Sequence, residues 1–357
     1  MKTIRNIYPQ IYDYENLYKA WESARKGKKY RDEVLTFSNN LESNLIDIQN
    51  HMIYKTYHVG RYRPFYVYEP KKRLVMALPF RDRVVQWAIY RKLFPLLETQ
   101  FIFDSYACRK GKGVHAAANR LQYWLCQTER KQEKYYYLKL DISKYFYRVD
   151  HAILMNIIGQ KIQDEDLKQI LSEIINCEDM KFGLPSGASP GEVTDDAWLD
   201  DVGMPIGNLT SQLFANLYLN ELDQFIKHTL HIHYYIRYMD DMIILGPDKA
   251  HLGKIKEEIE SFLNHTLKLQ LNDKTTIRPC SMGIDFVGFH IRSTHRKLKK
   301  QTARKIEARI RFLFQGVKNG EIEKSTLEQS VASYDGILKH FSSYGFCQKL
   351  NRIYTKI

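Results

Sequence analysis

The sequence predicts an α+β protein, because short strand-like segments alternate with helical ones. Three observations support this fold class. One segment alternates with a period of two, a second carries apolar residues at helical spacing, and a third contains two apolar strands joined by a tight turn. In chain order these segments are residues 135–141, 210–228 and 234–246.

The remaining segments complete a mixed arrangement. Apolar residues at helical spacing predict one amphipathic helix over residues 31–57. Residues 62–80 are rich in β-forming side chains and turn at Glu69–Pro70, which predicts a hairpin. We further expect helices over 82–99, 112–127 and 248–266, short strands at 274–278 and 283–291, and a basic helical tail.

Composition limits the class of protein. With 44% apolar and 27% charged residues, the 357-residue chain is typical of a globular protein with a sizeable core. No apolar run reaches the roughly 18 residues of a membrane span, and charges interrupt the N-terminus, which argues against a secretory signal. Five cysteines without a CxxC pair argue against a disulfide scaffold and a thiolate zinc site, and favour a reducing cytosol.

Charge is distributed unevenly along the chain. The net charge is +13, and residues 291–357 hold 15 Lys and Arg against 5 Asp and Glu. Such a run is either a solvated helix face or a surface that follows nucleic-acid phosphates, and a membrane surface attracts the same patch. In contrast, residues 184–202 hold five acids and no Lys or Arg, and their Pro, Gly and Ser content predicts a solvated loop.

Three carboxylates are the strongest chemical signal. Tyr137, Lys139 and Asp141 share one face of the predicted strand 135–141, and Asp240–Asp241 occupy the turn of the later hairpin. Antiparallel pairing of these strands would bring the three acids together. Clustered carboxylates bind Mg²⁺, and a pair of such ions can activate a hydroxyl and stabilise leaving pyrophosphate. The pattern therefore predicts nucleotidyl transfer.

The sequence around these acids resembles bacterial reverse transcriptases. YMDD at 238–241 is similar to their catalytic turn, and further blocks follow in the family's order across about residues 60–291. These blocks include KKRLVMALPFRDRVVQWAIY (71–90), FDSYACRKGKGVHAA (103–117), LKLDISKYFYRVDH (138–151), GMPIGNLTSQLFANLYLNELD (203–223), LQLNDKTTI (269–277) and GIDFVGFHI (283–291).

The resemblance implies a right-hand polymerase with fingers, palm and thumb. The palm would contain an antiparallel sheet and the thumb would be small and helical. The implied boundaries are an N-terminal helical extension at 1–60, fingers at 61–135, palm at 136–150, fingers with the acidic insertion at 151–202, palm and primer grip at 203–291, and a basic helical thumb at 292–357.

The resemblance also assigns catalytic roles. Asp141, Asp240 and Asp241 match the metal-binding triad, which implies two Mg²⁺ ions with the Ile142 carbonyl as a further ligand. Lys274 matches a lysine that protonates the leaving pyrophosphate, although it is equally placed to be an ordinary surface lysine.

Nucleotide and template contacts are implied in the same way. Phe146, five residues after Asp141, matches the position that rejects a 2′-hydroxyl and so favours dNTPs. The remaining dNTP-binding positions are Lys72, Arg73, Lys144, Tyr145, Ile206 and Gly207. Template and primer contacts are implied for Arg109, Lys110, Lys112, Asn208, Gln212, Tyr238, Met239, Gly283 and Gly288.

One block departs from the common family pattern. Most reverse transcriptases carry QGxxxSP, whereas this chain has Ile206-Gly-Asn-Leu-Thr-Ser-Gln212. The variant resembles reverse transcriptases of diversity-generating retroelements, which copy a template-repeat RNA into error-prone cDNA. Loss of the hydrogen bond made by the glutamine weakens the positioning of the incoming nucleotide by about 0.5–1.5 kcal/mol, so relaxed base selection is expected. Alternatively, Ile206 packs beneath the nucleotide and other residues set fidelity.

This resemblance implies an RNA template, a cDNA primer, dNTPs and a pentameric basic accessory variability protein as partners, without a membrane. It places the protein in a bacterial cytoplasm, encoded by the bacterium or a phage. Two alternatives stay open. One is a retron-type or defence-associated reverse transcriptase, and the other is a non-catalytic RNA-binding protein on a polymerase fold, which would have no reason to keep three mutually repelling acids.

Overall fold

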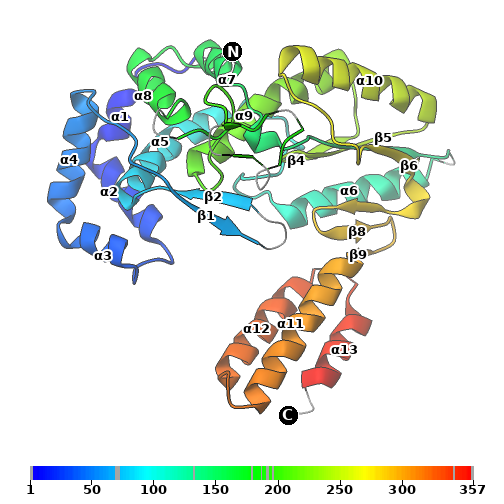
Figure 1. The fold of residues 1–357 in the computed structure, drawn as a ribbon. Helices are drawn as coiled ribbons and strands as arrows, with labels where there is room; N and C mark the ends of the chain where they lie inside the picture. The colour runs from blue at the N-terminus through cyan, green and yellow to red at the C-terminus, as the bar shows by residue number, and fades with distance from the viewer. Residues whose placement is uncertain are drawn as a thin grey trace. The chain divides into compact units, whose positions relative to one another are not determined.

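The computed structural model describes residues 3–68, 73–131, 133–177, 180–185, 187–189, 193–194, 197–340 and 342–354 (Figure 1). It divides into two compact units, which are described separately. The first contains residues 1–103, 142–231 and 258–272, and the second contains residues 104–141, 232–257 and 273–357. Lys72, the predicted turn at Glu69–Pro70 and three acids of the acidic loop (Glu192, Asp195 and Asp196) lie outside the described residues.

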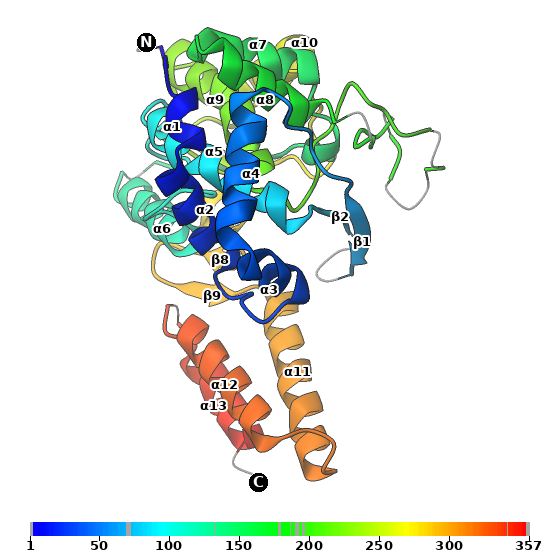
Figure 2. The same cartoon turned by 90° about the vertical axis from the view of Figure 1, so that its left-hand side faces the viewer.

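The first unit begins with four helices: α1 (Tyr8–Tyr12), α2 (Tyr14–Arg25), α3 (Asp32–Asn39) and α4 (Leu41–Ile53). Figure 2 shows α1, α2 and α4 side by side, and α2 packs against α5 (Phe80–Glu98). The single helix predicted over 31–57 is wrong, because Asn40 adopts a non-helical conformation with φ −119° and ψ 43° and separates α3 from α4.

The predicted hairpin also lies in the first unit. Strands β1 (Arg63–Val67) and β2 (Arg73–Ala77) pair antiparallel, with Val67 opposite Arg73. Every residue of β1 is exposed, whereas Leu74 and Met76 of β2 are buried. The unit also contains α7 (His151–Lys161), α8 (Glu165–Ile175) and α9 (Leu209–Gln224), which continues into a π-helical turn over Phe225–Thr229. The predicted helix over 210–228 is therefore confirmed with this change of winding at its end.

The second unit is built on a four-stranded antiparallel sheet. Its strands are β3 (Tyr136–Asp141), β4 (Tyr235–Tyr238), β5 (Asp241–Gly246) and β6 (Thr276–Pro279), in the order β4-β5-β3-β6. Helix α6 (Val114–Glu129) packs against this sheet, and Leu121 and Trp124 lie in the same buried core as Ile236 and Ile243. Helix α10 (Lys249–Thr266) follows β5 and crosses the boundary between the units.

A second, three-stranded sheet adjoins the same core. It contains β7 (Ile284–Phe286), β8 (Phe289–Ile291) and β9 (Arg296–Leu298), all antiparallel. The single strand expected over 283–291 is therefore wrong: the chain reverses at Val287 and Gly288, whose φ angles are +42° and +89°.

The basic tail forms three helices: α11 (Lys300–Lys318), α12 (Lys324–Leu338) and α13 (Tyr344–Tyr354). They share a small apolar core that includes Ile310, Leu313 and Leu327. No helix in the described part of the chain is long and apolar enough to cross a bilayer. The α+β fold class with antiparallel sheets is confirmed, while the fingers, palm and thumb boundaries stay a prediction.

Candidate active site

Two of the predicted catalytic acids lie opposite each other in the sheet. Strand β3 pairs with β5 so that Asp141 faces Asp241, and β4 pairs with β5 so that Tyr238 also faces Asp241. Asp241 is therefore the first residue of β5 and not part of the turn. The connection is a two-residue hairpin, Met239–Asp240, in which Met239 has φ +55°. Strand pairing alone thus brings Asp141, Asp240 and Asp241 to one end of the sheet.

The Asp241 carboxylate is half-buried and has a lysine beside it. Lys139 Nζ lies 3.1 Å from Oδ1 and donates a hydrogen bond to Oδ2 at 3.2 Å. The same ammonium donates to the Asp285 carbonyl on β7 at 2.7 Å. Oδ1 is buried and accepts no well-directed hydrogen bond within the described residues, so its contact with Lys139 is ionic only.

Electrostatics at this carboxylate favour a cation. The pKa of Asp241 is raised to about 6, chiefly by burial; Lys139 and, more weakly, Lys299 lower it, and the negative charge of Asp141 raises it. Desolvated like charges of this kind are stable only beside a positive group. The pKa shift and the lack of a well-directed hydrogen bond at Oδ1 therefore both fit a site for a hard cation.

The donor set suits a divalent metal, because carboxylate and carbonyl oxygens are the ligands that Mg²⁺ prefers. The described side chains nevertheless contain no group of three or more His, Cys, Asp and Glu already close enough to hold an ion. Ile142, the predicted carbonyl ligand, is buried and pairs in an isolated bridge with Leu271 in the first unit. Metal binding would thus require the carboxylates to close around the ion.

A buried arginine supports the hairpin that carries Asp240. The side chain of Arg237 is fully buried on β4, and its Nη1 donates to the Met239 carbonyl at 3.1 Å. Its backbone joins the segment before α6: the Arg237 amide donates to the Asp104 carbonyl at 3.0 Å, and the Arg237 carbonyl accepts from Tyr106 at 3.0 Å. The buried side chain of Arg237 therefore stabilises the Met239–Asp240 turn.

Other predicted residues of the second unit lie in loops. Arg109 donates to the Ser105 carbonyl at 2.9 Å, Lys112 Nζ lies 4.8 Å from the centroid of the Tyr106 ring, and Lys110 is exposed. Lys274 is exposed in the turn before β6. The template, primer and proton-donor roles of these residues stay predictions.

The two predicted primer-grip glycines both need positive φ. Gly283, just before β7, has φ +78°, and a Cβ there would lie 2.8 Å from His290 Cε1. Gly288, in the β7–β8 turn, has φ +89° and open space where a Cβ would point. A side chain at either position would strain the backbone, and at Gly283 it would also displace a neighbour.

The predicted nucleotide-binding residues that the structure describes all belong to the first unit. Tyr145–Tyr147 form a short 3₁₀ helix after Lys144, which has φ +48°. The Phe146 carbonyl accepts from the Met204 amide at 2.7 Å, and the Tyr145 hydroxyl donates to the Ala215 carbonyl at 2.6 Å. Lys144 Nζ donates to the carbonyls of Gly187 and Ala188 in the acidic loop.

The Ile206–Gly207 segment lies against strand β2. The Met76 amide donates to the Ile206 carbonyl at 2.9 Å. Gly207 has φ +117°, and a Cβ there would meet Val75 Cγ1 at 2.9 Å. Burial raises the pKa of the Tyr147 hydroxyl, and Arg73, the first residue of β2, is close enough to lower it in part. Strand β2, the 3₁₀ helix and residues 204–207 therefore meet at one place.

Hydrogen bonds to Tyr62 and Gln86 anchor the next residues, Asn208 and Leu209. Asn208 is buried and its side-chain amide donates to the Tyr62 hydroxyl at 2.7 Å, while Leu209 donates its backbone amide to Gln86 Oε1 at 3.1 Å. Gln212 is exposed on α9. Contacts of Asn208 and Gln212 with template or primer stay predictions, and the Asn208 amide already serves to anchor the start of α9.

Sequence reasoning missed two site residues, Lys139 and Arg237. For Lys139 the signal was present, because a period of two places it on the same face as Asp141. Arg237 sits in a strand that is otherwise apolar, where a charged residue indicates a buried partner.

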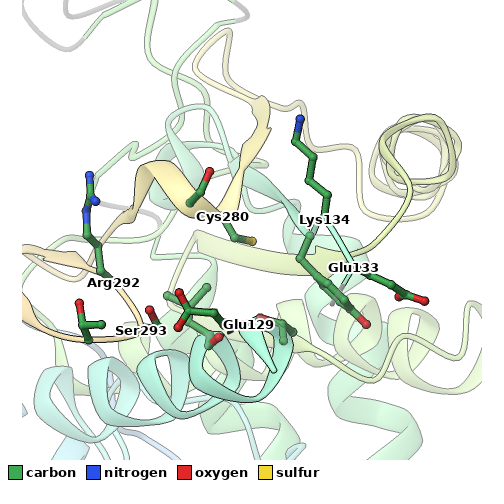
Figure 3. Close-up of a pocket in the computed structure, with 11 residues that line it drawn as sticks. Glu129, Glu133, Lys134, Cys280, Arg292 and Ser293 are labelled. Carbon is green, nitrogen blue, oxygen red and sulfur yellow. Dashed lines mark hydrogen bonds between the residues drawn. The ribbon is translucent and has the colours of Figure 1, made fainter. Parts of the chain in front are cut away.

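A separate pocket of about 460 Å³ in the second unit does not belong to this site. Figure 3 shows side chains of both charges around it, including Glu129, Glu133, Lys134 and Arg292. None of the predicted site residues lines it.

Comparison with known proteins identifies the family. Residues 68–291, more than half of the chain, match the family model described as "Reverse transcriptase (RNA-dependent DNA polymerase)". The chain belongs to the reverse transcriptase family. The fold is therefore a right-hand polymerase fold and the protein is an RNA-directed DNA polymerase; reverse transcriptases generally use divalent metal ions.

Individual relatives span the same region. Protein YkfC of Escherichia coli K12 is 29% identical over 287 residues, which are 68% of this chain and 69% of YkfC. The group II intron-encoded protein LtrA of Lactococcus lactis subsp. cremoris is 23% identical over 354 residues, 80% of this chain and 55% of LtrA. A putative COX1/OXI3 intron 2 protein of Saccharomyces cerevisiae is 22% identical, and the chain spans only 31% of its length.

Among solved structures, apo telomerase from Candida tropicalis, truncated from its C-terminal domain, aligns with a TM-score of 0.46 at 13% identity, covering 72% of this chain and 60% of the telomerase chain. The family assignment rests on the sequence match over residues 68–291. The individual relatives do not decide the type of retroelement.

Proposed function

We propose that this reverse transcriptase carries out nucleotidyl transfer at Asp141, Asp240 and Asp241 with two Mg²⁺ ions. The observation that carries the proposal is the in-register pairing of Asp141 with Asp241, with Asp240 in the adjoining two-residue turn. When bound, the ions would supply Lewis-acid activation of the primer hydroxyl and charge stabilisation of pyrophosphate. The three carboxylates would hold and orient them.

The chain's own residues would divide the remaining tasks. Arg73 would offer paired donors to the triphosphate, with Lys72 as a further cation, and the backbone amides of Lys144 and Tyr145 would hold its outer phosphates. The ring of Phe146 would exclude a 2′-hydroxyl. Lys274 would donate a proton to the leaving pyrophosphate.

Primer extension on an RNA template with dNTPs and Mg²⁺ tests the catalytic assignment. We expect Asp240→Asn and Asp241→Asn to abolish extension, since each removes one negative oxygen ligand. Asp248→Asn, an exposed acid just before α10, is the matched control and should extend normally. Activity in the Asp240→Asn/Asp241→Asn double variant would exclude the mechanism.

We further propose that the enzyme copies template RNA with relaxed base selection, as in diversity-generating retroelements. The supporting feature is Ile206, whose side chain cannot make the hydrogen bonds of the glutamine common in the family. Because the Ile206 carbonyl is held by the Met76 amide, a substitution there changes the side chain while that main-chain bond persists. The retron-type and defence-associated alternatives make no such prediction for Ile206.

Misincorporation opposite template adenine tests this second proposal. Ile206→Gln should lower the error frequency, by up to about tenfold if one neutral hydrogen bond is regained. Ile206→Val keeps a branched apolar side chain and should retain the parent's error frequency. Equal errors in the parent and Ile206→Gln would assign fidelity to other residues.

The fingers, palm and thumb boundaries, the template contacts and the pentameric basic accessory protein belong to the same proposal. Co-purification with the small basic protein encoded by a neighbouring gene tests whether such a partner binds. Paired repeats that differ mainly at adenines, in the flanking DNA, would support the retroelement type independently of the protein.

A further inference from the structure

Lys139 lies where a cation bound to Asp241 would lie. Its Nζ is 3.1 Å from one carboxylate oxygen of Asp241 and 3.2 Å from the other, so one ammonium faces both oxygens. A divalent ion that used this carboxylate would meet the ammonium first. An ammonium and a divalent ion on the same carboxylate repel each other, so binding of the ion favours departure of the ammonium.

The lysine also has a second anchor. Its Nζ donates to the Asp285 carbonyl at 2.7 Å, a shorter contact than either contact with Asp241. Asp285 lies on β7, opposite His290 of β8, within residues 203–291, which are predicted to form the palm and primer grip. An ammonium that left Asp241 would therefore keep a hydrogen-bond acceptor, which lowers the cost of its displacement.

We propose that Lys139 is a placeholder cation that neutralises Asp241 in the metal-free enzyme and is displaced from it, towards the Asp285 carbonyl, when the metal binds. Lys139 is thus a positioning residue that acts through Asp241 and touches neither substrate nor reacting atoms. The idea rests on the proposed metal role of Asp241. It explains why the acids can lie on adjacent strands before any metal arrives.

Binding of Mg²⁺ alone, without nucleic acid, tests the proposal by calorimetry. Lys139→Met removes the competitor, so the dissociation constant for Mg²⁺ should fall by about threefold or more. Lys139→Arg keeps a cation and should stay near the parent. Lys249→Met, an exposed lysine at the start of α10, makes the same change in net charge and should not alter the affinity.

Thermal unfolding gives a second readout that does not depend on activity. Metal-free Lys139→Met removes the nearest cation from the Asp241 carboxylate and leaves only the weaker influence of Lys299, so its melting temperature should fall below that of Lys249→Met. Added Mg²⁺ should then raise the melting temperature of Lys139→Met by more than it raises that of the parent, because ligand stabilisation follows affinity. Equal shifts in the two proteins would overturn the proposal.

Asp241→Asn separates this idea from the proposed function. If Asp241→Asn binds Mg²⁺ like the parent, Asp241 is no metal ligand and both proposals fail. If Asp241→Asn loses Mg²⁺ while Lys139→Met binds it with unchanged or weaker affinity, the metal site stands and the placeholder role of Lys139 is overturned.

A measurement on the unmodified protein covers the case in which Lys139→Met does not fold. Lysine-specific labelling read by mass spectrometry should show Lys139 becoming more reactive when Mg²⁺ is added, because it loses its ion pair and keeps only its hydrogen bond to the Asp285 carbonyl. Lys249 provides the internal reference and should label equally in both states. Unchanged labelling of Lys139 would contradict displacement.

Discussion

Asp141 on β3 lies directly opposite Asp241 on the neighbouring strand β5. Opposed acids on neighbouring strands repel each other and destabilise the sheet unless a cation intervenes. Lys139, two residues before Asp141 on the same strand, supplies that cation at 3.1 Å from Asp241. The arrangement costs stability in the metal-free fold, and this cost leads to a measurable pH dependence.

The first prediction concerns the stability of the metal-free protein. The pKa of Asp241 rises from 3.8 to about 6 on folding, chiefly through burial. The folded state therefore binds this proton more tightly than the unfolded state, and stability falls as pH rises from about 4 to about 6. Asp241→Asn cannot ionise, so at pH 7.5 it should be more stable than the parent by roughly 3 kcal/mol.

Denaturation in the presence of a chelator, at pH 4 and pH 7.5, checks this prediction. The advantage of Asp241→Asn should be present at pH 7.5 and nearly absent at pH 4, where the carboxyl is protonated in the parent as well. The exposed control Asp248→Asn should show no such advantage. If the free energy of unfolding depends on pH equally in the parent and in Asp241→Asn, folding does not raise the pKa of Asp241.

The second prediction concerns the choice of sugar. The main chain of Phe146 is held by the Met204 amide at 2.7 Å, so shortening the side chain should leave the segment in place. Phe146→Ala should raise incorporation of rNTPs relative to dNTPs by at least about tenfold, since a pocket discriminates by excluded volume. Phe146→Tyr keeps the ring and should keep the preference. Single-nucleotide kcat/KM values measure the ratio, and an unchanged ratio in Phe146→Ala would assign discrimination elsewhere.

Local periodicity correctly predicted the strands that carry the candidate site. The alternation over 135–141 and the two apolar runs over 234–246 became β3, β4 and β5, because burial on a sheet imposes a period of two on the sequence itself. The convergence of the acids followed from antiparallel pairing. The register of the paired strands could not be predicted from the sequence, and this register places Asp241 in β5 rather than in the turn.

Contacts between distant segments could not be predicted in this way. Lys139 and Asp241 are neighbours only because strands far apart in sequence pair in one register. Val287 is a strong strand former, yet the chain reverses there with φ +42°, so tertiary packing overrides its local preference. Asn40 likewise interrupts a helical pattern whose apolar spacing continues across it.

The third prediction compares two glycines of the β7–β8 hairpin region. Gly288→Ala meets open space and should cost only the strain of positive φ, about 1 kcal/mol. Gly283→Ala adds a collision with His290, whose Nδ1 lies 2.8 Å from Asp285 Oδ1, so that contact must also move. Urea unfolding should therefore rank Gly283→Ala as the less stable variant.

A second step isolates the collision. In the His290→Ala background, Gly283→Ala should lose its extra cost and approach the cost of Gly288→Ala. Equal stability of the two single variants would mean that His290 moves freely and that backbone strain alone matters at Gly283.

The last prediction concerns Arg237 and the hairpin that carries Asp240. Its guanidinium is fully buried and donates to the Met239 carbonyl at 3.1 Å, in a turn where Met239 has φ +55°. Arg237→Met removes this donor and should destabilise the protein by about 1–3 kcal/mol, the usual cost of leaving a buried acceptor without its hydrogen bond.

Arg237→Lys separates charge from geometry. Lysine retains the positive charge but lacks the planar fork, so the turn should loosen and the Mg²⁺ concentration for half-maximal extension should rise even where the protein stays folded. Arg278→Met, an exposed arginine on β6, is the matched control and should leave both stability and Mg²⁺ dependence unchanged. If Arg237→Lys matches the parent in both measurements, charge inside the fold is sufficient, and the geometry of the Met239–Asp240 turn is set by strand pairing alone.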